Sequence, residues 1–376
     1  MAAPSPASPP DPPAGGGLSP AWRAPLLILG FAGLVTGALA GLARLGWSVP
    51  AFAASASGLH GPLMICGFFG VVISLERAVA IGRRWAYAGP LVTGLGTLAA
   101  LAGASAIASW LTVAGSVVLL AATIDVFRRQ AALFTFTLTL GALCWSAGNV
   151  LWAGGANVHD VVTWWLAFLV LTIAGERLEL SRFLPPSPIA KYAFAAILVV
   201  IVAGLLGAGS SWGAPLFGGG LVALALWLLK QDIARRTVRN RGLTRFIAVC
   251  LLSGYAWLGT GGAILVAAGG LAPGSPSYDA ALHALALGFV FSMVFGHAPI
   301  IFPAVLRVAV PYHPTFYLPL ALLHASLVVR LVGDATRQFD WTRAGGLLNT
   351  LALAAFIAST ASAVARANRR PGPKPA

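Results

Sequence analysis

The most regular feature of the chain is a series of long apolar stretches separated by short connections. A helix needs about 20 apolar residues to cross a bilayer core, because each residue rises about 1.5 Å. Glycine and proline pairs, such as Gly154-Gly155 and Pro273-Gly274, mark the connections. The pattern predicts twelve membrane spans, near residues 24–46, 58–80, 86–103, 107–127, 131–153, 158–180, 190–208, 212–230, 245–269, 279–306, 316–333 and 342–365.

Composition supports the same class of protein. Of the 376 residues, 58% are hydrophobic and only 9% are charged, which is too few polar side chains to coat a soluble globule of this size. We therefore predict an all-α, polytopic membrane protein whose partner is the lipid bilayer. The membrane domain is expected over 23–366, between a disordered Pro- and Ala-rich tail (1–22) and a basic disordered tail (367–376).

The net charge of +14 at first suggests nucleic-acid binding, but its distribution indicates membrane topology instead. If the N-terminus is cytoplasmic, all but four of the 24 Lys and Arg fall on the cytoplasmic side. This asymmetry is the positive-inside bias of membrane proteins. We predict an inner-membrane protein with both termini cytoplasmic and no nucleic-acid partner. The four cations on the predicted outer side are Arg44, Arg330, Arg337 and Arg343.

Three histidines occupy equivalent places in this pattern. His60, His159 and His283 lie at the starts of the second, sixth and tenth predicted spans. Even-numbered spans run in the same direction, so the three imidazoles are expected at one depth near the outer face. Ionisable side chains at membrane depth are costly and usually functional. Because imidazole is a common metal ligand, these positions predict a metal or cofactor site.

A weak internal repeat relates the first two of these histidines. Glu76-Arg77 follows His60, and Glu176-Arg177 follows His159, each time at the cytoplasmic end of the span. The repeat unit is therefore four helices long. We predict three such units around a pseudo-threefold axis, with a cofactor site built from the facing second helices.

Two further residue types extend the candidate site. Met64 lies one helical turn after His60, and Met293 follows His283 along the tenth span. His297 lies 14 residues after His283, about 21 Å along a helix, so one cofactor cannot be held by both. His297 is therefore a candidate for a separate metal ligand.

Each histidine also has a structural interpretation. His60 and His283 can be interfacial residues bonded to carbonyl groups, and His159 can be a helix-start residue in a Trp-rich aromatic belt. His297 can be a polar-cavity residue. His313 is expected in a solvated loop. Two interpretations stay open for His324, which lies in the middle of the eleventh span: it is either a bonded interior histidine or part of a second site with His297.

The second and tenth spans resemble those of the NnrS family. The similarity rests on His60, Met64 and Gly67-Phe68 in the second span, and on His283-Ala284-Leu285, Gly288 and Met293 in the tenth. NnrS proteins are twelve-span bacterial membrane proteins linked to nitric oxide stress and described as binding haem and copper. Their helix plan is similar to subunit I of the haem-copper oxidases, whose metal ligands also fall on helices two, six and ten.

The resemblance implies a membrane haem protein that acts in the response to nitric oxide, in redox sensing or in metal handling. It implies haem of the b type, with copper as a second metal. The adjacent histidine pair of the oxidases is absent from the sequence, so reduction of dioxygen to water is not expected. The alternative is a secondary transporter with a midplane site near the proline-broken tenth span, at Pro299 and Pro303.

Overall fold

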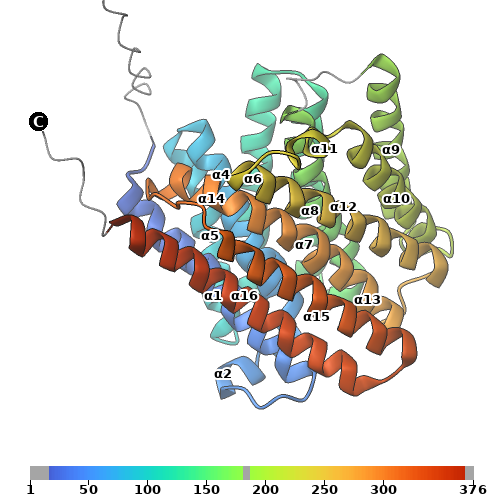
Figure 1. Cartoon of the computed structure of the whole chain (residues 1–376). Coiled ribbons are helices and arrows are strands. Elements are labelled where there is room, and N and C mark those ends of the chain that lie inside the picture. Colours follow the sequence, from blue (N-terminus) through green and yellow to red (C-terminus); the bar gives the residue numbers. More distant parts are fainter. Residues whose placement is uncertain (1–16, 181–186, 369–376) are drawn as a thin grey trace, which may run out of the picture.

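A computed structural model describes residues 17–180 and 187–368, and this part of the chain is helical without a strand. Figure 1 shows the helices packed in one bundle. Its α-helices are α1 (Pro20–Arg44), α2 (Ala51–Ala54), α3 (His60–Pro62), α4 (Val71–Ile81), α5 (Ala88–Leu101), α6 (Ser105–Arg129), α7 (Leu133–Ala153), α8 (Val158–Leu180), α9 (Pro188–Leu206), α10 (Gly213–Gln231), α11 (Ala234–Thr237), α12 (Gly242–Ala268), α13 (Pro276–His283), α14 (Ser292–Leu306), α15 (Tyr317–Thr336) and α16 (Phe339–Asn368).

The predicted class, an all-α polytopic membrane protein, is confirmed. Within the described residues, 11 helices are long and apolar enough to cross a membrane. The third predicted span is the exception, because α5 has only 14 residues and is about 21 Å long. A tight turn, η3 (Arg84–Tyr87), takes up the start of that predicted span.

Two of the long helices are interrupted by wide π-helical segments. The second span runs through η1 (Ser57–Leu59), α3, the π-helical η2 (Leu63–Gly70) and α4. The tenth span runs through α13, the π-helical η5 (Ala284–Phe291) and α14. π-helical turns inside α-helices often occur at functional sites. Here each one begins one to three residues after a candidate histidine, and the hydrophobic pattern gave no sign of either.

The packing of the helices repeats three times along the chain, as the four-helix unit predicts. In each unit the first helix contacts the second and the third contacts the fourth, as in the pairs α7 with α8, α9 with α10, and α15 with α16. The second helices of the three units also meet, because α8 contacts both η2 and η5. Residues from all three second helices therefore line a common space.

Local sequence signals account for the helix boundaries. Pro20 opens α1 at a position where its missing N–H costs nothing, three residues inside the predicted N-terminal tail. Ser275 caps α13 by accepting a hydrogen bond from the Tyr278 amide. Gly155 and Gly274 adopt positive φ in the connections that their glycines predicted. At the other end, α16 continues to Asn368, two residues into the predicted C-terminal tail. Residues 1–16 and 369–376 of the predicted tails lie outside the described residues.

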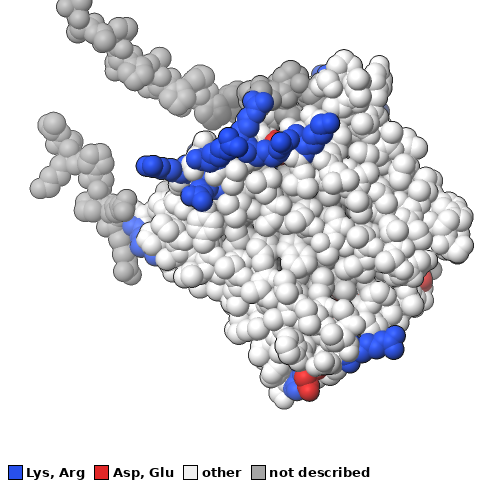
Figure 2. All heavy atoms as spheres, turned by 45° about the vertical axis from the view of Figure 1, so that its right-hand side comes forward, with Lys and Arg blue, Asp and Glu red and all other residues white. Residues whose placement is uncertain are grey.

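The two ends of the bundle differ sharply in charge. Figure 2 shows Lys and Arg gathered at one end, above a broad belt of uncharged surface. We call this the basic end; it includes the connection between α10 and α12. The opposite end, where α2 lies in Figure 1, carries His60, His159 and His283, and we call it the histidine end.

Candidate functional site: a histidine-lined cavity

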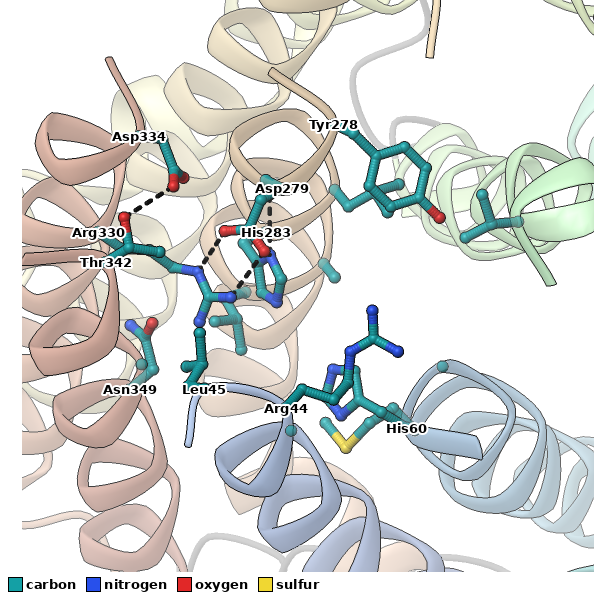
Figure 3. A pocket seen from close by; sticks show the side chains of 18 of the residues that line it. Arg44, Leu45, His60, Tyr278, Asp279, His283, Arg330, Asp334, Thr342 and Asn349 are labelled. Atoms are coloured by element: carbon teal, nitrogen blue, oxygen red, sulfur yellow. Dashed lines mark hydrogen bonds and ion pairs between the residues drawn. The ribbon is translucent and has the colours of Figure 1, made fainter. Parts of the chain in front are cut away.

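A cavity of about 730 Å³ opens at the histidine end of the bundle. It is lined by His60 from the second span, His159 from α8 and His283 from α13, so the structure brings together the three histidines that the sequence placed at one depth. Figure 3 shows this cavity with His60 and His283 on helices that face each other. Cofactor pockets in proteins usually span about 300–1,000 Å³, so the space suits one bound group.

His60 is positioned by the first helix. Its Nδ1 lies 2.7 Å from the carbonyl oxygen of Gly37 in α1. A carbonyl only accepts hydrogen bonds, so Nδ1 carries the proton and Nε2 keeps its lone pair. The ring fits because Gly41 has no side chain: a Cβ atom there would lie 2.8 Å from two atoms of the imidazole. The glycines of α1 therefore shape the site, which the sequence analysis did not anticipate.

His283 is held in the same tautomer by its own helix. Its Nδ1 lies 2.8 Å from the carbonyl oxygen of Asp279, one turn earlier. The Asp279 carboxylate is also 3.3 Å from the same nitrogen. Both oxygens are acceptors, so Nδ1 donates and Nε2 is again available. In metal sites, hydrogen bonds of this kind from the far ring nitrogen fix the orientation of the ligating histidine and raise its basicity.

The two imidazoles are arranged as a pair. Their ring centroids are 6.3 Å apart and their planes differ by 20°. Two imidazoles that share one metal, each through a bond of about 2 Å, have centroids about 6 Å apart. The spacing and tautomers of His60 and His283 therefore suit ligation of a single metal centre. Within the described residues, no group of three or more His, Cys, Asp or Glu could hold a metal ion.

Cations of the histidine end surround this pair. Arg330 binds the Asp279 carboxylate through two hydrogen bonds of 2.6 and 2.8 Å. Arg44 and Arg337 also line the cavity, and Figure 3 shows the Arg44 guanidinium above His60, directed into the space. Three of the four cations that break the charge asymmetry of the sequence are thus cavity residues. The charge pattern of the sequence could have identified these arginines as candidate site residues, because Lys and Arg are uncommon in the outer connections of membrane proteins.

The other predicted ligands lie at different distances from the pair. Met64 lines the cavity beside His60, and its sulfur packs against Gly37. His159 lies at the margin of the cavity with 39% of its side chain exposed, and its Nε2 is 3.3 Å from Asp160. Met293 is buried and faces Gly254 of α12, outside the cavity lining. The prediction that the tryptophans beside His159 belong to an aromatic belt at the membrane surface is wrong for Trp165, because its side chain is fully buried inside the bundle.

His297 belongs to a second polar cluster, toward the basic end. Its Nδ1 donates to the Met293 carbonyl at 2.7 Å, and its Nε2 is 3.4 Å from Nη1 of Arg177. Arg177 in turn makes two hydrogen bonds, of 2.7 and 3.0 Å, with Asp232, which also accepts one from Tyr255 at 2.7 Å. The Arg177 guanidinium contacts Nε2 of His297, the nitrogen whose lone pair a metal would need. The structure thus separates His297 from the His60–His283 pair, as the sequence predicted.

The remaining histidines have structural partners. His324 accepts a hydrogen bond from the Trp257 indole at 2.9 Å and contacts the Ser253 hydroxyl at 3.0 Å, so it is a bonded interior histidine. His313 is exposed and bonds within its own loop, to Thr315. Pro299 and Pro303 lie inside the continuous helix α14 and do not line the histidine cavity.

Comparison with known proteins identifies a family but no described activity. A family model for a domain of unknown function, DUF8744, matches residues 23–365. The chain belongs to the DUF8744 family. No curated protein matches it. The matched range agrees closely with the predicted membrane domain, 23–366, and it contains every candidate site residue.

Proposed function

We propose that this DUF8744 protein binds haem of the b type between His60 and His283, as the resemblance to the NnrS family implies. Its role would be redox sensing or the handling of nitric oxide or metals under nitrosative stress, in a bacterial inner membrane. The paired geometry of the two imidazoles, with both Nε2 atoms available, carries the proposal. Haem fits because it takes only one or two ligands from the protein.

The side chains around the pair would each serve the bound group. Nε2 of His60 and of His283 would bind the iron, and the carbonyls of Gly37 and Asp279 would keep the two rings oriented. Arg44 and Arg330 line the same cavity and would balance negative charge on the bound group. The iron would supply one-electron chemistry, which ligation and burial tune.

Copper is the second metal in this proposal. Met64 lines the cavity and offers a thioether, a ligand that Cu(I) accepts. His159 at the margin of the cavity adds an imidazole as a second donor, whereas both ring nitrogens of His60 are already committed, Nδ1 to the Gly37 carbonyl and Nε2 to the proposed haem. Metal analysis separates this part of the proposal from the haem part.

The direct test is an absorption spectrum with iron and copper analysis of the purified full-length protein. We expect a Soret band and a redox-sensitive α band, with about one iron per chain. A colourless, iron-free protein from haem-replete cells would overturn the haem proposal. It would favour the transporter alternative, which a solute-uptake assay in vesicles would then examine.

The cellular role is tested separately, by deleting the gene and exposing cells to a nitric oxide donor. We expect slower recovery of growth in the deletion strain, restored by the wild-type gene but not by His283→Ala. Equal recovery with and without the gene would contradict a role in nitrosative stress, even if haem is bound.

A further inference from the structure

The connection between α10 and α12, residues 230–245, is the most strongly charged segment at the basic end. It leaves the membrane span of α10 after Gln231 and enters that of α12 at Gly242. Both span ends fix the connection at the level of the lipid headgroups. Its six cations are Lys230, Arg235, Arg236, Arg239, Arg241 and Arg245.

The single carboxylate of this connection is directed inward. The Asp232 side chain is only 2% exposed and binds Arg177 of α8, Tyr255 of α12 and the Ala234 amide. The Asp232 carboxylate therefore makes its interactions inside the bundle, where it links the connection to α8 and α12. The outward surface of the connection consequently keeps its full positive charge.

The short helix α11 has two distinct sides. Ala234 is fully buried and Val238, one turn later, packs against the core. Arg235, Arg236 and Arg239 are exposed on the other side. In the part of the chain that the structure describes, no ion pair joins these arginines to a carboxylate. By contrast, Arg129 in the last turn of α6 pairs with Asp125 at 2.6 Å.

We propose that the outward face of residues 230–245 binds the phosphate groups of anionic lipids, and that Arg235, Arg236 and Arg239 form the centre of the site. Guanidinium groups recognise phosphate through paired hydrogen bonds, and each cation near an anionic membrane surface adds to binding. Because residues 230–245 lie at the level of the lipid headgroups, we infer that the bound phosphate belongs to a lipid. This site is independent of the haem proposal, because it lies at the opposite end of the bundle.

The test uses detergent-purified full-length protein and native mass spectrometry, with phosphatidylglycerol against phosphatidylcholine. The variant is Arg235→Gln/Arg236→Gln/Arg239→Gln. The matched control, Arg83→Gln/Arg84→Gln/Arg128→Gln, removes the same charge from exposed arginines elsewhere at the basic end. We expect the preference for phosphatidylglycerol to fall by about tenfold or more in the first variant and by less than about twofold in the control.

Three results would overturn the proposal. One is an equal loss in both variants, which would mean that total charge and not this connection selects the lipid. Another is an unchanged preference in the first variant. The third is displacement of phosphatidylglycerol by inorganic phosphate, which would show a free-anion site in place of a lipid site. Matching size-exclusion profiles and melting temperatures establish that both variants are folded.

Discussion

Two clusters of the same composition each take their histidine from the long helical run from Pro276 to Leu306, and their surroundings differ. Each combines a doubly hydrogen-bonded Arg–Asp pair with a histidine: Arg330, Asp279 and His283 at the histidine end, and Arg177, Asp232 and His297 toward the basic end. The first borders a cavity, whereas the Arg177 and Asp232 side chains of the second are buried, with only 5% and 2% of their surface exposed.

The contrast rests on where the second ring nitrogen of each histidine points. Nδ1 of both rings donates to a carbonyl four residues earlier in the helix. Nε2 of His297 meets a guanidinium, while Nε2 of His283 has no protein partner in the described residues. The same residue types thus form a buried ion-pair cluster in one place and border an open cavity, the proposed ligand site, in the other.

The largest expected effect concerns the haem proposed at the open cluster. On that proposal, His60→Ala and His283→Ala should each abolish a six-coordinate, low-spin spectrum and leave a five-coordinate haem or none, because one of the two proposed nitrogen ligands is missing. His297→Ala and His324→Ala remove histidines with protein partners and should leave that spectrum intact. Absorption spectra and haem content of the four variants make the measurement.

A low-spin spectrum retained at full occupancy in both His60→Ala and His283→Ala would contradict the assignment. Loss of the spectrum in His297→Ala alone, in folded protein, would show that the two clusters have been assigned the wrong roles.

The second effect concerns stability at the closed cluster. Asp232→Ala leaves the Arg177 guanidinium buried and unpaired, so we expect a loss of about 3–5 kcal/mol, seen as a lower melting temperature in detergent. Asp279→Ala should cost about 1–2 kcal/mol, because 29% of the Asp279 side chain is exposed and cavity water can solvate Arg330.

The double variant Arg177→Leu/Asp232→Leu serves as the control. Removing both charges should recover part of the stability lost in Asp232→Ala, since no unpaired ion then remains. A larger loss in Asp279→Ala than in Asp232→Ala would reverse the comparison between the clusters.

The third prediction tests how α1 shapes the open cluster. Gly41→Ala places a Cβ atom 2.8 Å from the His60 ring, so we expect a cost of about 1–3 kcal/mol and weaker haem retention. Gly259→Ala in α12 is the matched control, because its Cβ atom would make only an ordinary 3.6 Å contact. Equal haem affinity in Gly41→Ala and wild type would show that the ring has room to shift.

The smallest effect is expected at the exposed histidine. His313→Ala removes a side chain that bonds only within its own loop, so its stability should stay within about 0.5 kcal/mol of the wild type. Its haem spectrum should be unchanged. A shifted spectrum would place His313 in the cofactor site, against the position that the structure gives it.

Much of the candidate site was predictable because membrane spans alternate in direction. Counting spans was enough to place His60, His159 and His283 at one end, and all three line one cavity. Counting could not distinguish their roles. His159 lies in a regular helix at the margin, whereas His60 and His283 each precede a π-helical segment. That difference arises from packing between helices and has no local signature.

The sequence by itself determined the class, the positions of all predicted spans but the third, and the common end at which the three histidines lie, because burial of an apolar helix in lipid depends mainly on composition and length. The tertiary structure decided which polar groups meet. Gly37 lies 23 positions from His60, Asp279 lies 51 from Arg330, and Arg177 lies 55 from Asp232. Such contacts depend on the rotation and packing of whole helices, which the hydrophobic pattern of a membrane protein does not encode.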